Sequence, residues 1–140
     1  MKRVLTVGVF DLFHVGHLNF LERARQHGDY LIVAVHDDKQ KSKGKDFFFD
    51  IDDRIRLIRG LRIVDEATIY ERVDLIVEQV CFDVFCHGPD QNHEYFARAR
   101  SYCAAHNKRV VLLERTPGIS STAIREFIDV QGECDGKYYS

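Results

Sequence analysis

The apolar residues of the chain gather in short runs, separated by segments of helical periodicity. Four runs are nearly continuous in Val, Ile, Leu, Phe or Cys, and they span residues 3–9, 30–35, 82–86 and 109–113. A continuous run of this length is typical of a parallel strand buried on both faces. A weaker run at 63–69 predicts a fifth strand. Apolar residues at helical spacing predict helices at 15–27, 52–60, 72–79, 92–106 and 120–130.

The alternation of strands and helices indicates the fold class. It predicts an α/β fold with a doubly wound, Rossmann-like parallel sheet of about five strands and helices on both faces. We expect one domain over residues 1–130 and a polar C-terminal tail over 131–140. In such sheets, ligands bind beyond the carboxyl ends of the strands, so the candidate site is expected there.

Composition and charge argue against several classes of function. The chain has 140 residues, of which 45% are hydrophobic and 30% charged, and its net charge is −2. It therefore has no global basic field that would favour nucleic acid, and no apolar run long enough for membrane insertion. Because the chain starts directly with a strand, we expect no secretory signal and a cytoplasmic location.

The cysteines indicate neither a metal site nor a disulfide framework. Cys81 and Cys86 lie in an apolar run, and we expect both to be small buried side chains rather than metal ligands. With Cys103 and Cys134 included, the chain shows no C-x-x-C spacing. Reduced thiols are typical of a cytoplasmic protein.

The strongest chemical signal follows the first predicted strand. After a turn at Asp11, His14 and His17 stand at the start of a helix. The first backbone N–H groups of a helix have no partner within the helix and bind phosphate well. Gly16, between the two histidines, lets a ligand approach the backbone closely. These residues predict a nucleotide site.

Three motifs resemble those of the nucleotidyltransferase superfamily. Residues 14–17 read H-V-G-H and follow a strand-Gly-x-F-D pattern, as in the H-x-G-H signature of that superfamily. Residues 115–122, R-T-P-G-I-S-S-T, resemble the R-T-x-G-I-S-T-T/S segment of cytidylyltransferases, and Arg62–Glu66 resembles their R-Y-V-D-E. The motifs occur in the family's order and span about residues 1–130. The chain thus resembles the cytidylyltransferase family, and in length and layout its bacterial glycerol-3-phosphate cytidylyltransferases.

The resemblance implies transfer of CMP from CTP to a small phosphorylated alcohol, similar to glycerol 3-phosphate, or to a phosphonate, with release of pyrophosphate. A phosphate monoester is mostly ionised at neutral pH, because its second pKa is about 6, so no general base is needed. The protein then aligns the nucleophile and stabilises charge on the phosphate oxygens. Mg²⁺ is expected with the triphosphate, held mainly by phosphate oxygens and water. The expected catalytic residues are His14, His17, Lys45 and Arg115.

The resemblance also implies which residues bind the nucleotide and the acceptor. Lysines alternate through residues 39–45, so they can converge on one anion or remain solvated loop charges. The acceptor is expected to contact Asp11, Asp90 and Arg62, although Asp90 also suits an Asx turn. The nucleotide is expected to contact Val9, Phe10, Gly16, Asp38, Lys43, Arg54, Gly88, Gly118, Ile119, Ser120, Ser121 and Thr122, of which the last three also suit a plain helix cap.

Alternative functions stay open at this point. The I-S-S-T segment followed by Ile124 and Arg125 also occurs in ATP-dependent adenylyltransferases of the same superfamily, such as those of flavin or pantetheine type. A non-catalytic nucleotide-binding module is a third interpretation. The resemblance also implies a homodimer with Arg62–Glu66 near the two-fold axis. The three phenylalanines at 47–49 cannot all face one core, so we expect at least one to be exposed or to cover a ligand or partner chain.

Overall fold

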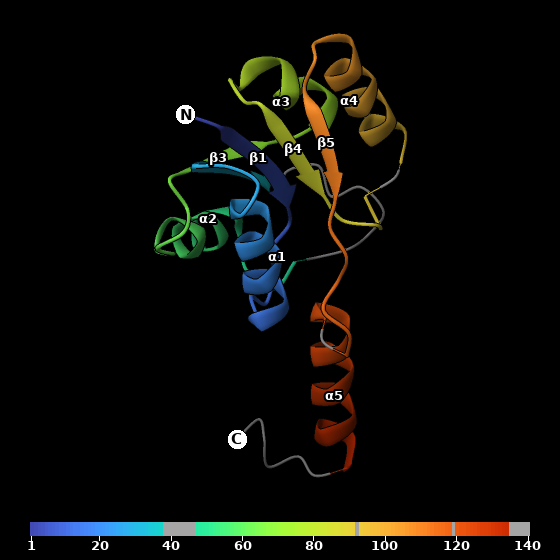
Figure 1. The fold of residues 1–140 in the computed structure, drawn as a ribbon. Coiled ribbons are helices and arrows are strands. Elements are labelled where there is room, and N and C mark those ends of the chain that lie inside the picture. The colour runs from blue at the N-terminus through green and yellow to red at the C-terminus, as the bar shows by residue number, and fades with distance from the viewer. Residues whose placement is uncertain (38–46, 92, 119, 135–140) are drawn as a thin grey trace.

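The fold is built around one parallel sheet with helices on both faces (Figure 1). The computed structural model describes residues 1–37, 47–91, 93–118 and 120–134. The strands in these ranges are β1 (Arg3–Gly8), β2 (Tyr30–His36), β3 (Glu66–Tyr70), β4 (Val84–His87) and β5 (Arg109–Leu112). The helices are α1 (Val15–Arg25), α2 (Ile51–Arg59), α3 (Val73–Gln79), α4 (Glu94–Ala105) and α5 (Ser121–Cys134).

The order of the strands shows where the winding of the chain reverses. The five strands lie in the order β3-β2-β1-β4-β5, and all neighbours are parallel. The chain winds outward from β1 to β3 and then crosses back to β4, so that β1 and β4 meet at the switch point. The prediction of a Rossmann-like parallel sheet is confirmed. Ligands of such sheets bind beyond the carboxyl ends of the strands at this point, which in this chain lie at Gly8 and His87.

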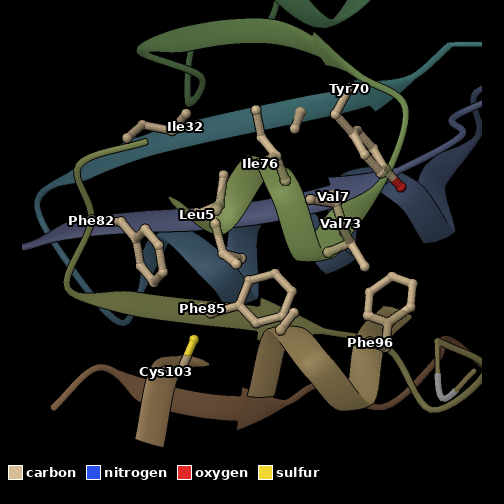
Figure 2. Close-up of a cluster of buried hydrophobic side chains, with 13 residues drawn as sticks. Leu5, Val7, Ile32, Tyr70, Val73, Ile76, Phe82, Phe85, Phe96 and Cys103 are labelled. Atoms are coloured by element: carbon tan, nitrogen blue, oxygen red, sulfur yellow. The ribbon is translucent and has the colours of Figure 1, made fainter. Parts of the chain in front are cut away.

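Each face of the sheet carries its own hydrophobic core. Leu5 of β1 and Phe85 of β4 pack on one face against Ile76 of α3 and Phe96 of α4 (Figure 2). Val4, the neighbour of Leu5 in β1, belongs to the core of the opposite face, which includes residues of α1 and α2. Because side chains alternate between the faces of a strand, burial of both faces explains the continuous apolar runs.

The predicted start of the third strand is wrong by three residues. β3 begins at Glu66 rather than at residue 63, because residues 61–64 form a turn in which the Val64 N–H donates to the Leu61 C=O over 3.2 Å. Ile63 and Val64 are instead partly buried against the core beside α1 and α2. Ile63 and Val64 are therefore apolar because the turn packs against the core. The sequence pattern alone does not distinguish such a turn from a strand.

α5 extends further than the sequence pattern predicts. It continues to Cys134, so the tail expected over 131–140 begins inside a helix, and residues 135–140 lie outside the described residues. Figure 1 shows this helix projecting beyond the layers of the sheet, and Phe127 on it is 65% exposed. The other boundaries shift by no more than two residues; for example, α1 ends at Arg25 and β4 starts at Val84.

The expectation for the two central cysteines is right for one of them. Cys86 of β4 is buried, but Cys81 is exposed, because the adjacent Phe82 takes the buried position in the segment before β4. Both are free thiols, as is buried Cys103. Among the described residues, no helix combines the length and the apolar character needed to cross a membrane.

Candidate active site

The turn between β1 and α1 holds one acid in a buried position. Phe10 and Leu12 have φ angles of 56° and 50°, in a region that strains residues other than glycine. Asp11 stands between them and is only 4% exposed. Gly8 makes room for this turn, because a Cβ there would lie 2.8 Å from two atoms of the Phe10 ring. The strain is therefore concentrated where the predicted site begins.

His14 and His17 cap the N-terminus of α1 through one nitrogen each. The Gly16 N–H donates to Nδ1 of His14 over 3.0 Å, and the His14 N–H donates to Nδ1 of His17 over 3.2 Å. A neutral imidazole whose Nδ1 accepts a hydrogen bond carries its proton on Nε2. Both histidines are thus helix caps and Nε2–H donors at the same time. The Nε2 atom of His14 is buried and has no hydrogen-bond partner among the described residues.

The surroundings keep both imidazoles neutral at neutral pH. The pKa of His17 is lowered from 6.5 to about 4, mainly by burial; His14 and Arg115 also lower it, and Asp11 acts in the opposite direction. The ring of Phe13 stacks on His17 at a centroid distance of 5.3 Å and contributes to this burial. Burial also lowers the pKa of His14. The pair therefore offers hydrogen-bond donors without positive charge.

A cavity of about 340 Å³ opens at the carboxyl ends of β1 and β4. It brings together many of the residues predicted from the sequence, from segments more than 100 positions apart. These are Val9, Phe10, Asp11, His14, Gly16, His17, Gly88, Asp90, Arg115 and Ser120. The lining also includes residues outside the expected catalytic, nucleotide-binding and acceptor-binding sets, namely Val7, Gly8, Phe20, Phe47, Gln91, Thr116 and Arg125.

Gln91 joins the two strands that meet below the cavity. Its Nε2 donates to the Val7 C=O of β1 over 3.0 Å, and its Oε1 accepts from the Gly88 N–H, at the end of β4, over 2.8 Å. Gln91 therefore links β1 to the end of β4 below the cavity. The only sequence signal for this role is its place in the loop that follows the fourth strand.

Two arginines at the cavity are each paired with an acid. Arg115 contacts the Asp90 carboxylate, and both side chains are largely exposed, at 65% and 59%. Arg125 of α5 contacts the Asp11 carboxylate, of which 4% is exposed. An exposed ion pair contributes little free energy and exchanges readily, whereas a buried carboxylate needs its partners. The two pairs therefore differ in how easily a phosphate can displace the acid.

The three adjacent phenylalanines are divided between the cavity and the surface. Phe47 lines the cavity, while Phe48 and Phe49 are 71% and 38% exposed. The prediction that at least one is exposed is confirmed. The backbone N–H groups of Phe48 and Phe49 donate to the Asp11 carboxylate over 2.7 and 2.9 Å, so this segment is fixed to the β1–α1 turn.

Arg54 lies beneath the site rather than in it. It is 1% exposed, and its guanidinium donates to the C=O groups of Phe49, Val9 and His36 over 3.0, 3.0 and 2.8 Å. It also lies over the Phe47 ring, 4.8 Å from the centroid. Arg54 is not among the described residues that line the cavity. Through the Val9 and His36 C=O groups, Arg54 connects the chain after β1 to the end of β2.

The remaining predicted residues lie outside the described lining of the cavity, at the start of α5 or outside the described residues. Arg62, Gly118 and Thr122 are exposed and are absent from the described lining of the cavity, although Gly118 has a φ of 81° that suits its glycine. Ser121 begins α5, and the Ser120 hydroxyl accepts from the Ala123 N–H over 3.0 Å, as expected of a helix cap. The predictions for Asp38, Lys43, Lys45 and Ile119 lie outside the described residues.

Fold and site together define the class of protein: a Rossmann-like nucleotidyltransferase with its cavity at the β1–β4 switch point. Comparison with known families agrees with this class. The family model described as "Cytidylyltransferase-like" matches residues 5–127, and the chain belongs to this family.

Individual relatives carry the names of two different nucleotidyltransferases. The chain is 39% identical to glycerol-3-phosphate cytidylyltransferase of Staphylococcus aureus over 131 residues, which cover 90% of this chain and 94% of that protein. It is 40% identical to FAD synthase of Thermococcus sibiricus over 100 residues, 68% of each chain. Among solved structures, a lipopolysaccharide core biosynthesis protein from Thermoplasma volcanium matches with a TM-score of 0.70 and 31% identity, covering 83% of this chain and 97% of that one.

Proposed function

We propose that this chain transfers the CMP group of CTP to a small phosphorylated alcohol of the glycerol 3-phosphate kind. In the reaction, an oxygen of the acceptor phosphate forms a bond to the α-phosphorus of CTP. The bond from that phosphorus to the bridging oxygen breaks, and pyrophosphate leaves with the electron pair. The product is a CDP-linked alcohol, and a phosphonate acceptor reacts in the same way.

The observation that carries the proposal is the buried Nε2 atom of His14, which has no partner among the described residues, in a residue that lines the cavity. A buried donor without a partner is costly, and a phosphate oxygen in the cavity satisfies it. His17 offers a second Nε2–H from the same helix end. The relatedness to glycerol-3-phosphate cytidylyltransferase over 94% of its length supports the choice of CTP and of the acceptor.

The residues of the cavity suit charge stabilisation rather than proton transfer. Neutral Nε2–H donors hold the non-bridging oxygens as charge develops on them, and Arg115 supplies a full positive charge. Arg115 exchanges its exposed Asp90 partner for phosphate at little cost. Asp90 is then free to accept hydrogen bonds from hydroxyl groups of the acceptor or the nucleotide.

Further substrate contacts belong to the proposal without support from the geometry. We assign Lys43 and Lys45 to the phosphates, Asp38 to the nucleotide and Arg62 to the acceptor by resemblance only. Mg²⁺ enters as part of the MgCTP substrate and offsets phosphate charge. Among the described residues, no group of three or more His, Cys, Asp or Glu side chains is placed to hold a metal ion, so phosphate oxygens and water are its expected ligands.

The direct test of the acceptor is pyrophosphate release from MgCTP with a panel of small phosphates and phosphonates. Glycerol 3-phosphate is expected to give the highest rate, and ethanolamine phosphate and sugar phosphates lower ones. The His17→Ala variant is expected to lose nearly all of this release. If no acceptor on the panel raises the rate above that of CTP alone, the acceptor class is wrong. Tight CTP binding without turnover would then favour a nucleotide-binding module.

An ATP-dependent adenylyltransferase is the second candidate. It is favoured by Arg125, which follows the I-S-S-T segment and lines the cavity, and by the relatedness to archaeal FAD synthase. This candidate predicts pyrophosphate release from ATP with FMN and a larger thermal shift with ATP than with CTP. The cytidylyltransferase proposal predicts the opposite preference in both experiments.

We propose that the working form is a homodimer. Leu57 is 46% exposed in a shallow groove that it forms with Asp53, Arg56, Gly60 and Leu61, directly before the Arg62–Glu66 segment. An isologous contact through this surface would cover the exposed leucine. Light scattering at micromolar concentration is expected to give twice the mass of the 16.3 kDa chain. A monomeric mass contradicts the proposal.

A further inference from the structure

Asp11 joins three segments that are distant in sequence. Its carboxylate accepts from the Phe48 and Phe49 N–H groups over 2.7 and 2.9 Å and contacts the guanidinium of Arg125. The acid comes from the β1–α1 turn, the two amides from the segment before α2, and the arginine from the second turn of α5. Both carboxylate oxygens are thus engaged within the protein.

The contact with Arg125 links α5 to the β1–α1 turn. Figure 1 shows the helix projecting beyond the sheet, with an extended connection from β5. The connection is tied to α1, where Asn19 Nδ2 donates to Thr116 Oγ1 over 3.2 Å and Arg23 donates to the Glu114 C=O over 2.7 Å. On the described part of the helix, Arg125 pairs with the buried carboxylate of Asp11. A helix of this length is marginal in water without tertiary contacts.

We propose that Asp11 is a positioning residue, which sets the start of α5 and the 47–49 segment against the nucleotide cavity. It acts through Ser120 and Phe47, which line the cavity, rather than by touching the acceptor. The expected change in KM rests on the proposed function. The contacts of Asp11 with Phe48, Phe49 and Arg125, called the clamp below, are present in the ligand-free protein.

Charge and burial explain why an aspartate is required. A buried carboxylate is stable only with several donors, and two amides and a guanidinium supply them at this position. The Phe48 N–H and Arg125 both contact Oδ2, so an asparagine with its oxygen there keeps these two donors only as a neutral acceptor, which weakens the arginine contact, and its NH₂ group then faces the Phe49 N–H. The strained φ angles of Phe10 and Leu12 hold the acid in place on both sides.

The kinetic consequence separates positioning from direct contact. If Asp11 positions α5 and Phe47, the Asp11→Asn variant has a KM for CTP raised about 10-fold, the effect of losing one charged hydrogen bond, with a smaller change in kcat. If Asp11 binds the acceptor, the KM for the acceptor rises instead and that for CTP does not. The second pattern overturns the proposal.

Hydrogen exchange of the ligand-free protein, followed by mass spectrometry, tests the clamp without any substrate. Asp11→Asn is expected to accelerate exchange about 10-fold in peptides covering 47–50 and 121–130, and Arg125→Gln only in 121–130. Asp129→Asn removes an exposed acid from the same helix and is the matched control, with no change expected. The β2 peptide is expected to stay protected in all variants, which shows that they are folded.

Two outcomes contradict the clamp. Exchange at wild-type rates in both peptides of Asp11→Asn shows that the carboxylate does not hold these segments. Unchanged exchange of 121–130 in Arg125→Gln shows that α5 is fixed by other contacts. Since neither readout involves catalysis, failure of the cytidylyltransferase proposal leaves this test intact.

Discussion

The backbone N–H of His14 donates to Nδ1 of His17, 3.2 Å away, so the second histidine of the motif fixes the conformation of the first. His14 in turn accepts from the Gly16 N–H, and the two rings stack at a centroid distance of 3.9 Å. The capping bonds determine which nitrogen of each ring carries the proton. The spacing of H-x-G-H therefore builds a helix end and a pair of neutral Nε2–H donors with the same four residues.

Replacing His17 by asparagine separates these two tasks. The asparagine oxygen can still accept from the His14 N–H, but the Nε2–H donor is lost. We expect turnover to fall about 10²- to 10³-fold, as for other donors to developing oxyanions, while the melting temperature stays close to that of the wild type. His17→Ala is the comparison, and it is expected to lose both turnover and stability. Full activity of the asparagine variant would exclude the donor role.

Stability is expected to depend on the protonation of His17. Burial holds its pKa at about 4 in the folded protein, against 6.5 when exposed, so the unfolded chain binds the proton more readily between these values. The contribution is therefore fully present above pH 6.5 and is lost as the pH falls toward 4. Thermal melts at intervals of half a pH unit measure this slope. His17→Asn is expected to flatten it, and an unchanged slope in that variant contradicts the assignment.

Gly8→Ala is expected to be destabilising. The new Cβ would lie 2.8 Å from two atoms of the Phe10 ring, so the strained turn has to move. A cost of roughly 1–3 kcal/mol in the free energy of unfolding is typical of such overpacking. Gly60→Ala is the matched control, because the nearest atom to its Cβ is 3.4 Å away at a helix end. Chemical denaturation measures the free energy of unfolding of both variants. Equal values would contradict the prediction, because they would show that the turn accommodates the new Cβ without cost.

Arg54→Lys distinguishes a structural arginine from a nucleotide ligand. The lysine offers one ammonium group for three backbone C=O groups, so we expect a loss of about 3 kcal/mol in the free energy of unfolding. Arg56→Lys, at an exposed position of the same helix, serves as the control and is expected to have little effect. A stable Arg54→Lys protein that has lost only CTP affinity, measured by calorimetry, would support the nucleotide role predicted from the sequence.

The fold and the centre of the site could be predicted from the sequence because both depend on local patterns. Strands buried on both faces leave continuous apolar runs, and H-x-G-H forms its cap within four residues. The start of β3 was missed because Ile63 and Val64 are apolar for a different reason, namely packing of a turn. Cys81 was missed because its neighbour Phe82 occupies the buried position.

Contacts between distant segments could not be predicted in this way. Asp11 and Arg125 are separated by 114 positions, and nothing in either local pattern indicates that they meet. Arg54 has the charge of a phosphate-binding residue, and only the structure shows that it is buried and donates to three backbone C=O groups. Residue type therefore indicates what a side chain can bind, while the fold decides which partner it has.

The most direct test of the central claim is one reaction with equal concentrations of CTP and ATP, glycerol 3-phosphate and Mg²⁺, followed by mass spectrometry of the products. We expect a CDP-linked glycerol and one pyrophosphate per product, with no ADP-linked product, and near-complete loss of product in His17→Ala. Formation of only an ADP-linked product would contradict the claim. So would CTP that remains unreacted when enzyme is present in an amount equal to the substrate.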